Sequence, residues 1–100
     1  MSLDALDEKI LAWGLEKGIL PNPDPLSQWD KTEEEVAELR QAIYEHDIDE
    51  VKDAIGDIYV TITMQAEAWG FTMEECVQAA YDVIKRRTGK MVDGKFVKDN

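Results

Sequence analysis

The sequence has few residues that could cross-link the chain or bind a soft metal, with one cysteine and one histidine among its 100 residues. Because Cys76 is alone, an intrachain disulfide is excluded, and a reducing compartment such as the cytoplasm is favoured. No apolar run approaches the roughly 20 residues of a membrane span, and the first residues lack a signal-peptide pattern. We therefore expect a soluble cytoplasmic protein with no membrane partner.

Basic residues are scarce as well, with 11 Lys and Arg against 22 Asp and Glu and a net charge of −11. This balance argues against duplex DNA or RNA as a partner, because both need a dense basic face. The charge is uneven: residues 1–81 hold 19 acidic and 5 basic side chains, whereas residues 82–100 hold 3 acidic and 6 basic ones. An apolar content of 44% can still build a core, so a single domain over residues 1–100 is expected.

Apolar residues recur at helical spacing in four stretches, which predicts an all-α chain. The first two helices are predicted over residues 3–17 and 25–45, the second with Asp24 as its cap. A later start of the second helix, at Asp30 or Thr32, stays open. The proline-rich segment between the two helices predicts an extended connection.

A third helix is predicted after a short break at residues 46–48. Its apolar stripe consists of Val51, Ile55, Ile58, Ile62, Ala66 and Trp69. Thr72 and Glu75 form a capping box that opens a fourth helix, which runs to about Arg87 and ends at Gly89.

The Asp93-Gly94 pair between two short apolar runs predicts a β-hairpin. The expected architecture is a four-helix bundle with a short C-terminal hairpin, and Trp13 and Trp69 are expected in its core. Trp29 either packs or stacks on a base. Because the third helix is too apolar for so small a chain to cover, self-association to a homodimer or tetramer is expected.

Acidic residues gather on one side of the second and third helices. They are Glu34, Glu35 and Glu38 on the second helix and Glu50, Asp53 and Asp57 on the third. If the two helices pack antiparallel, these carboxylates approach one seam, where they repel one another unless a cation is present. Hard divalent cations such as Mg²⁺ prefer all-oxygen ligands. The alternative is that these acids point into solvent and form no site.

The pattern Gln28-x-x-Lys31-x-x-Glu34-Glu35-Val36-Ala37-Glu38, followed by Gly56-Asp57 on a long apolar helix, resembles the MazG-like all-α nucleoside triphosphate pyrophosphohydrolases. That family carries EExxE on one helix and ExxD on the next. The basic ending from Lys85 to Gly94 is similar to that of phage and bacterial members.

The resemblance implies that Glu35, Glu38 and Asp57 bind Mg²⁺, for which Mn²⁺ can substitute, and that Glu34 orients or deprotonates the attacking water. One departure concerns the metal ligands: the family's ExxD glutamate falls on Ala54. Asp53 is expected to fill that place. Glu50-x-x-Asp53, an offset copy of the motif, leaves the fourth ligand and the number of metals open.

The same resemblance implies cleavage of nucleoside triphosphates, expected to be deoxynucleotides, to a monophosphate and pyrophosphate. Lys85 and Arg87 are expected to hold phosphates, with Lys31 a further candidate, and Asp82 stands where relatives often have Asn near the nucleotide. Two alternatives are a phosphoribosyl-ATP or dUTP pyrophosphohydrolase and a non-catalytic helical oligomerisation module.

Overall fold

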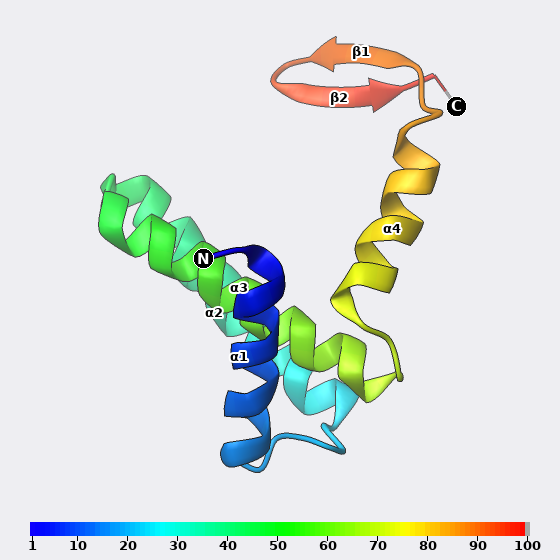
Figure 1. The fold of residues 1–100 in the computed structure, drawn as a ribbon. Coiled ribbons are helices and arrows are strands. Elements are labelled where there is room, and N and C mark those ends of the chain that lie inside the picture. Colours follow the sequence, from blue (N-terminus) through cyan, green and yellow to red (C-terminus); the bar gives the residue numbers. More distant parts are fainter. Residues whose placement is uncertain (100) are drawn as a thin grey trace.

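The computed structural model describes residues 1–99, which form four helices and a two-stranded hairpin (Figure 1). The elements are α1 (Leu3–Glu16), α2 (Pro25–Glu45), α3 (Ile48–Ala68), α4 (Met73–Ile84), β1 (Gly89–Val92) and β2 (Lys95–Lys98). The all-α class with a C-terminal hairpin is thereby confirmed. Asn100, the last residue of the predicted domain, lies outside the described residues.

Each helix begins at a side chain that accepts a hydrogen bond from a backbone N–H three residues later. At α2 the Asp24 carboxylate accepts from the Ser27 N–H at 2.9 Å, which confirms the early start of this helix. At α4 the Thr72 hydroxyl accepts from the Glu75 N–H at 3.1 Å, as the capping box predicts. The break before α3 is shorter than expected, because Asp47 already serves as its cap.

The end of α4 differs from the prediction: the helix stops at Ile84 rather than near Arg87. The N–H groups of Arg86 and Arg87 bond to carbonyls three residues back, so the last turn tightens and closes. Gly89 does not end the helix but opens β1. A Cβ on it would meet the carbonyl oxygen of Val97 and the ring of Phe96. Gly89 therefore allows the two strands to approach closely. The turn of the hairpin lies at Asp93 and Gly94, which have the positive φ values of 49° and 79° that this two-residue connection requires.

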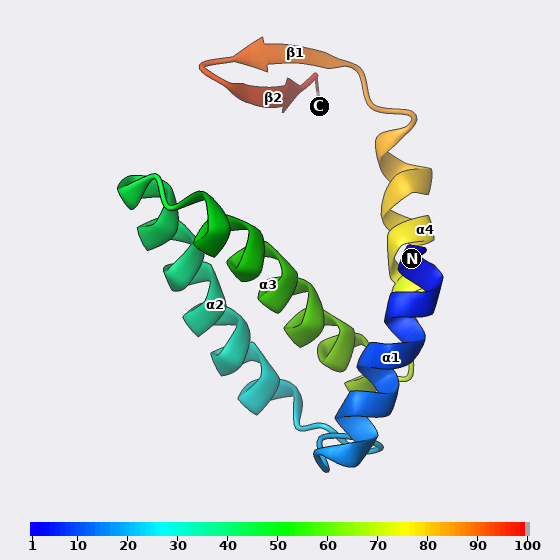
Figure 2. The same cartoon turned by 60° about the vertical axis from the view of Figure 1, so that its left-hand side comes forward.

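Helices α2 and α3 run side by side and form the main packed pair (Figures 1 and 2). Their interface uses small and polar residues: Ala42 and Ala54 are 1% and 0% exposed, and the Thr32 hydroxyl donates to the Thr61 hydroxyl at 2.8 Å. Small side chains let the two helix backbones approach closely, which brings side chains on their facing sides together.

The apolar stripe predicted for α3 is only partly covered within one chain: Ala66 is buried, whereas two of its larger members are exposed. Ile55 is 55% exposed and Trp69 is 64% exposed, and Trp13 on α1 is 42% exposed. The prediction that Trp13 and Trp69 lie in the core is therefore wrong for the single chain. Helical periodicity finds an apolar face but does not say which element covers it, and Trp69 stands at the C-cap of α3 where little of the chain is near.

Helix α1 is fixed to α3 by a hydrogen bond from the Tyr59 hydroxyl to the Asp7 carboxylate at 2.7 Å. Burial, followed by the bond to Asp7 and that carboxylate's charge, raises the pKa of Tyr59 to about 12. This contact holds α1 across α3 and so fixes the apolar side chains of α1 relative to the α2–α3 pair.

Helix α4 and the hairpin extend away from the other helices (Figure 2). Helix α4 has no buried residue, every described residue of the hairpin is exposed, and the hairpin packs on none of the helices. The helices of residues 1–99 include none that combines the length and apolar character needed to cross a bilayer.

Candidate metal centre and substrate pocket

Three carboxylates from the facing sides of α2 and α3 meet in one cluster. Glu35, Glu38 and Asp57 each place one oxygen so that the three atoms lie within 4.8 Å of one another. Glu35 and Glu38 are three residues apart on one helix face, and Asp57 approaches from α3 one turn before Thr61. We call these three residues the carboxylate cluster.

Glu35 is the most buried member of the cluster, with 9% of its surface exposed. Among the described residues its Oε2 atom is a buried oxygen without a hydrogen-bond partner. Burial, followed by the neighbouring Glu38 and Asp57 carboxylates, raises the pKa of Glu35 to about 7. A buried, unpartnered acceptor beside two like charges is the environment in which a bound cation lowers the free energy most.

Two further acids lie at the α3 side of the cluster. Burial and the Asp53 carboxylate raise the pKa of Asp57, and burial with Asp53 and Asp47 raises that of Glu50. Asp53 is therefore close enough to Asp57 to act on its charge, although it is exposed and stands outside the cluster of three. Ala54, in the register of the family's missing glutamate, is fully buried.

Lys31 and Glu34 pair with each other at the rim of the site. The Lys31 Nζ lies 3.2 Å from a carboxylate oxygen of Glu34, and more than half of each side chain is exposed. This hydrogen bond raises the pKa of Lys31. Glu34 thus points toward Lys31 and solvent, whereas its neighbour Glu35 points into the cluster.

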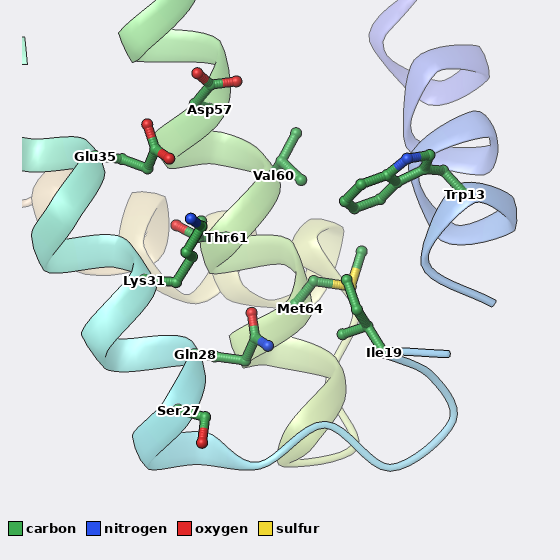
Figure 3. A pocket seen from close by; sticks show the side chains of 10 residues that line it. All are labelled: Trp13, Ile19, Ser27, Gln28, Lys31, Glu35, Asp57, Val60, Thr61 and Met64. Atoms are coloured by element: carbon green, nitrogen blue, oxygen red, sulfur yellow. The ribbon is translucent and has the colours of Figure 1, made fainter. Parts of the chain in front are cut away.

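A pocket of about 350 Å³ opens beside the cluster, between α1, α2 and α3 (Figure 3). Glu35, Asp57 and Lys31 line one end of it. Trp13, Ile19 and Met64 line the opposite end, with Trp13 projecting from α1. One end therefore suits a cation with an anion, and the other suits a flat apolar group.

Asp82 belongs to α4, and Lys85 and Arg87 follow it; α4 and the segment after it lie apart from the α2–α3 pair within one chain (Figure 1). Lys85 pairs with Asp82 at 3.2 Å near the end of α4. Arg87 borders a separate small pocket with Lys98 and Asp99. A single chain therefore brings together the predicted site residues of α2 and α3, but the predicted residues at the end of α4 lie elsewhere.

The sequence model of the MazG nucleotide pyrophosphohydrolase domain matches residues 24–92, which is more than half of the chain. The chain belongs to this family. Comparisons with curated proteins and with solved structures found no match. The MazG match spans α2, α3, α4 and the first strand, so it includes the carboxylate cluster and leaves out α1.

The cluster of this MazG domain fits a divalent cation: its oxygens converge, all are carboxylate oxygens, and one buried oxygen lacks a partner. Sequence reasoning missed the contribution of α1 to the pocket. Trp13 falls on an apolar helical stripe, and periodicity does not distinguish a pocket wall from a core residue.

Proposed function

We propose that this MazG domain hydrolyses nucleoside triphosphates, deoxynucleotides among them, to a monophosphate and pyrophosphate in a Mg²⁺-dependent reaction. The observation that carries the proposal is the cluster of Glu35, Glu38 and Asp57 at the polar end of a pocket whose other end is apolar. A polyphosphate and a base need these two environments side by side. A cytoplasmic location suits such a substrate.

Glu35, Glu38 and Asp57 would hold the cation, with Asp53 completing the set in place of the glutamate absent at position 54. Mg²⁺ or Mn²⁺ bound there offsets the charge of the polyphosphate and polarises its phosphoryl oxygens. Glu35 is 9% exposed, and a carboxylate shielded from water interacts more strongly with a cation than an exposed one.

Lys31 and Glu34 supply the remaining steps. A substrate phosphate competes with Glu34 for the Lys31 ammonium, so binding breaks the 3.2 Å ion pair at the rim. Glu34 is then available to accept a proton from the attacking water, whose oxygen bonds to phosphorus as the anhydride bond between the α- and β-phosphates breaks. A positioned base of this kind contributes about 10²–10⁴-fold.

Assembly belongs to the same proposal. Val77, Tyr81 and Ile84 on α4 are each more than half exposed, as is Ile55 on α3. A second copy, as homodimer or tetramer, would cover these faces. The C-terminal segment is basic and the rest of the chain strongly acidic, so a second copy can also bring Asp82, Lys85 and Arg87 to the phosphates beside the cluster.

Pyrophosphate release from a panel of ribo- and deoxynucleoside triphosphates, with Mg²⁺, Mn²⁺ or chelator, tests the proposal. We expect release from at least one nucleotide, strictly dependent on the cation. Asp57→Asn should abolish it, whereas Glu33→Gln, an exposed acid on α2, should not. Including dUTP and phosphoribosyl-ATP in the panel separates the two narrower enzymatic alternatives.

A non-catalytic oligomerisation module would behave differently. Calorimetric titration with Mg²⁺ and a nonhydrolysable nucleotide should then show binding of neither. Silence of the whole panel together with silent calorimetry would overturn the proposed function.

A further inference from the structure

The two ends of the pocket are joined by side chains from three helices (Figure 3). Val60 lies between the cluster and Trp13, and Met64, 1% exposed, lies next to Ile19 at the apolar end. Gly14 allows this arrangement, because a Cβ at that position would lie 2.9 Å from the Met64 methyl carbon. The Tyr59–Asp7 hydrogen bond holds α1 in place. The indole of Trp13 is therefore a fixed wall, with 42% of the residue still exposed for contact.

One polar side chain of the apolar half has its hydrogen-bonding groups available. Gln28 lines the pocket and is half-buried, and within residues 1–99 its side-chain amide makes no hydrogen bond. The neighbouring hydroxyls are already used. Ser27 donates to Asp24 at 2.8 Å, and Thr61 donates to the Ile58 carbonyl at 2.8 Å while accepting from Thr32.

We propose that the apolar end is a nucleobase pocket in which the base packs against Trp13 and the Gln28 amide hydrogen-bonds to the edge of the base. The proposal rests on the proposed function, which places the polyphosphate at the carboxylate cluster. A Gln amide presents a donor and an acceptor side by side, and rotation about its last bond reverses their order. Gln28 can therefore pair with both amino and keto bases, so we expect the pocket to accept both, and a substitution that fixes the donor and acceptor pattern at this position should create a preference.

Binding to the wall is measured by tryptophan fluorescence, which needs no turnover. In the Trp29→Phe, Trp69→Phe variant Trp13 is the one remaining tryptophan. We expect a nonhydrolysable nucleoside triphosphate with Mg²⁺ to change its emission, and inorganic tripolyphosphate with Mg²⁺ to leave it unchanged. Equal responses to the two ligands would overturn the proposal.

Trp13→Ala should weaken nucleotide binding about tenfold, within the range that base–aromatic stacking supports, while tripolyphosphate binding stays the same. Trp29→Ala is the matched control, because Trp29 is exposed, adjoins Gln28 in sequence and does not line the pocket. Loss of affinity for both ligands in Trp13→Ala would assign the residue to packing of α1 and contradict a base contact.

Gln28 offers an independent variant. Gln28→Glu replaces the donor with a second acceptor, which matches the adjacent N1–H and N2–H donors of guanine. The guanine-to-adenine ratio of nucleotide affinities should rise about tenfold, and Gln28→Leu should weaken both bases alike. An unchanged ratio in Gln28→Glu would overturn the role of Gln28. Base-dependent binding without pyrophosphate release would refute the proposed hydrolysis but support the base pocket. Hydrolysis with an unaltered KM in Trp13→Ala would support the proposed hydrolysis but refute the base pocket.

Discussion

The hydroxyl of Thr32 on α2 donates a buried 2.8 Å hydrogen bond to the hydroxyl of Thr61 on α3, one helical turn from the carboxylate cluster. Thr61 in turn donates to the carbonyl of Ile58 on its own helix. The bond ties the two helices together at the point where the cluster needs them close. It also gives each of the two buried hydroxyls a hydrogen-bond partner.

Removing one partner of this pair should destabilise the protein. Thr61→Val removes the acceptor across the helices, but the Thr32 hydroxyl can still donate to the Gln28 carbonyl at 3.0 Å, so the expected cost is about 0.5–1.5 kcal/mol, a fall in Tm of a few degrees. The double variant Thr32→Val, Thr61→Val should be less destabilised than the two single effects combined, because the same hydroxyl–hydroxyl bond is lost in each single variant and is lost only once in the double variant. Thermal denaturation gives the comparison. Thr63→Val, which loses only a bond to its own helix at Tyr59, serves as control.

Neutralising a cluster carboxylate should separate activity from stability. Glu35→Gln, Glu38→Gln and Asp57→Asn each remove a charged ligand of the proposed cation, so each should abolish most pyrophosphate release, and each also removes one charge from a mutually repelling group. In chelator, Glu35→Gln should raise stability by about 1–2 kcal/mol, since one pKa unit corresponds to about 1.4 kcal/mol. Glu33→Gln should change neither quantity. A Glu35→Gln protein that fails to fold would show that the residue is structural.

The metal-free protein should become more stable as the pH falls from 8 to 5. Its folded-state pKa of Glu35 is raised to about 7 from an ordinary value of 4.5, so the folded chain binds more protons than the unfolded chain between these values. The stabilisation is complete below pH 4.5 and is lost as the pH rises through 7. Urea denaturation in chelator at several pH values measures this slope, and Glu35→Gln should flatten it. A slope of the opposite sign in the unsubstituted protein would contradict the cluster's arrangement.

Asp53 and Glu50 can be distinguished by their effect on the metal. Asp53 acts directly on the charge of Asp57, so Asp53→Ala should weaken the apparent Mg²⁺ affinity by at least about tenfold, or 1.4 kcal/mol. Glu50→Ala should do less, as judged from Mg²⁺ titration of pyrophosphate release. An inactive Glu50→Ala with an unchanged Asp53→Ala would favour the offset Glu50-x-x-Asp53 motif instead.

Ala54→Glu tests the departure from the family motif. Position 54 is fully buried, so a glutamate there adds a charge to the interior and should lower Tm in chelator. Mg²⁺ or Mn²⁺ should recover much of that loss if the new carboxylate reaches the metal. No recovery would mean that position 54 only fills space between the helices.

Most of the local structure could be predicted from the sequence because its signals are local. Asp24, Thr72 and the Asp93-Gly94 pair each bond or turn within a few residues, so their chemistry fixes the helix starts and the hairpin regardless of the rest of the chain. The approach of acidic residues of α2 and α3 to one seam was also predictable once the two helices were taken to pack antiparallel, and the MazG resemblance indicated Glu35, Glu38 and Asp57 among the six.

The remaining differences concern contacts between distant elements. The buried contacts of α2 and α3 include alanines, a threonine pair and Glu35, whereas the apolar periodicity of α3 points to larger residues, of which Ile55 and Trp69 are exposed. Trp13 lines an open pocket because α1 crosses α3 where Asp7 accepts a hydrogen bond from Tyr59, which lies 52 residues later in the sequence than Asp7. No local pattern encodes that crossing, and the same periodicity describes a core face, a pocket wall and an assembly face.

The exposed α4 and hairpin have a consequence for how this protein unfolds. If a second copy covers α4 and the hairpin, their folding is linked by mass action to association, because the apolar surface that stabilises them is then supplied by the second copy. The unfolding temperature should then rise with protein concentration, and dilution should loosen the C-terminal segment before the α2–α3 pair. A measured Tm would then hold only for the protein concentration at which it was measured.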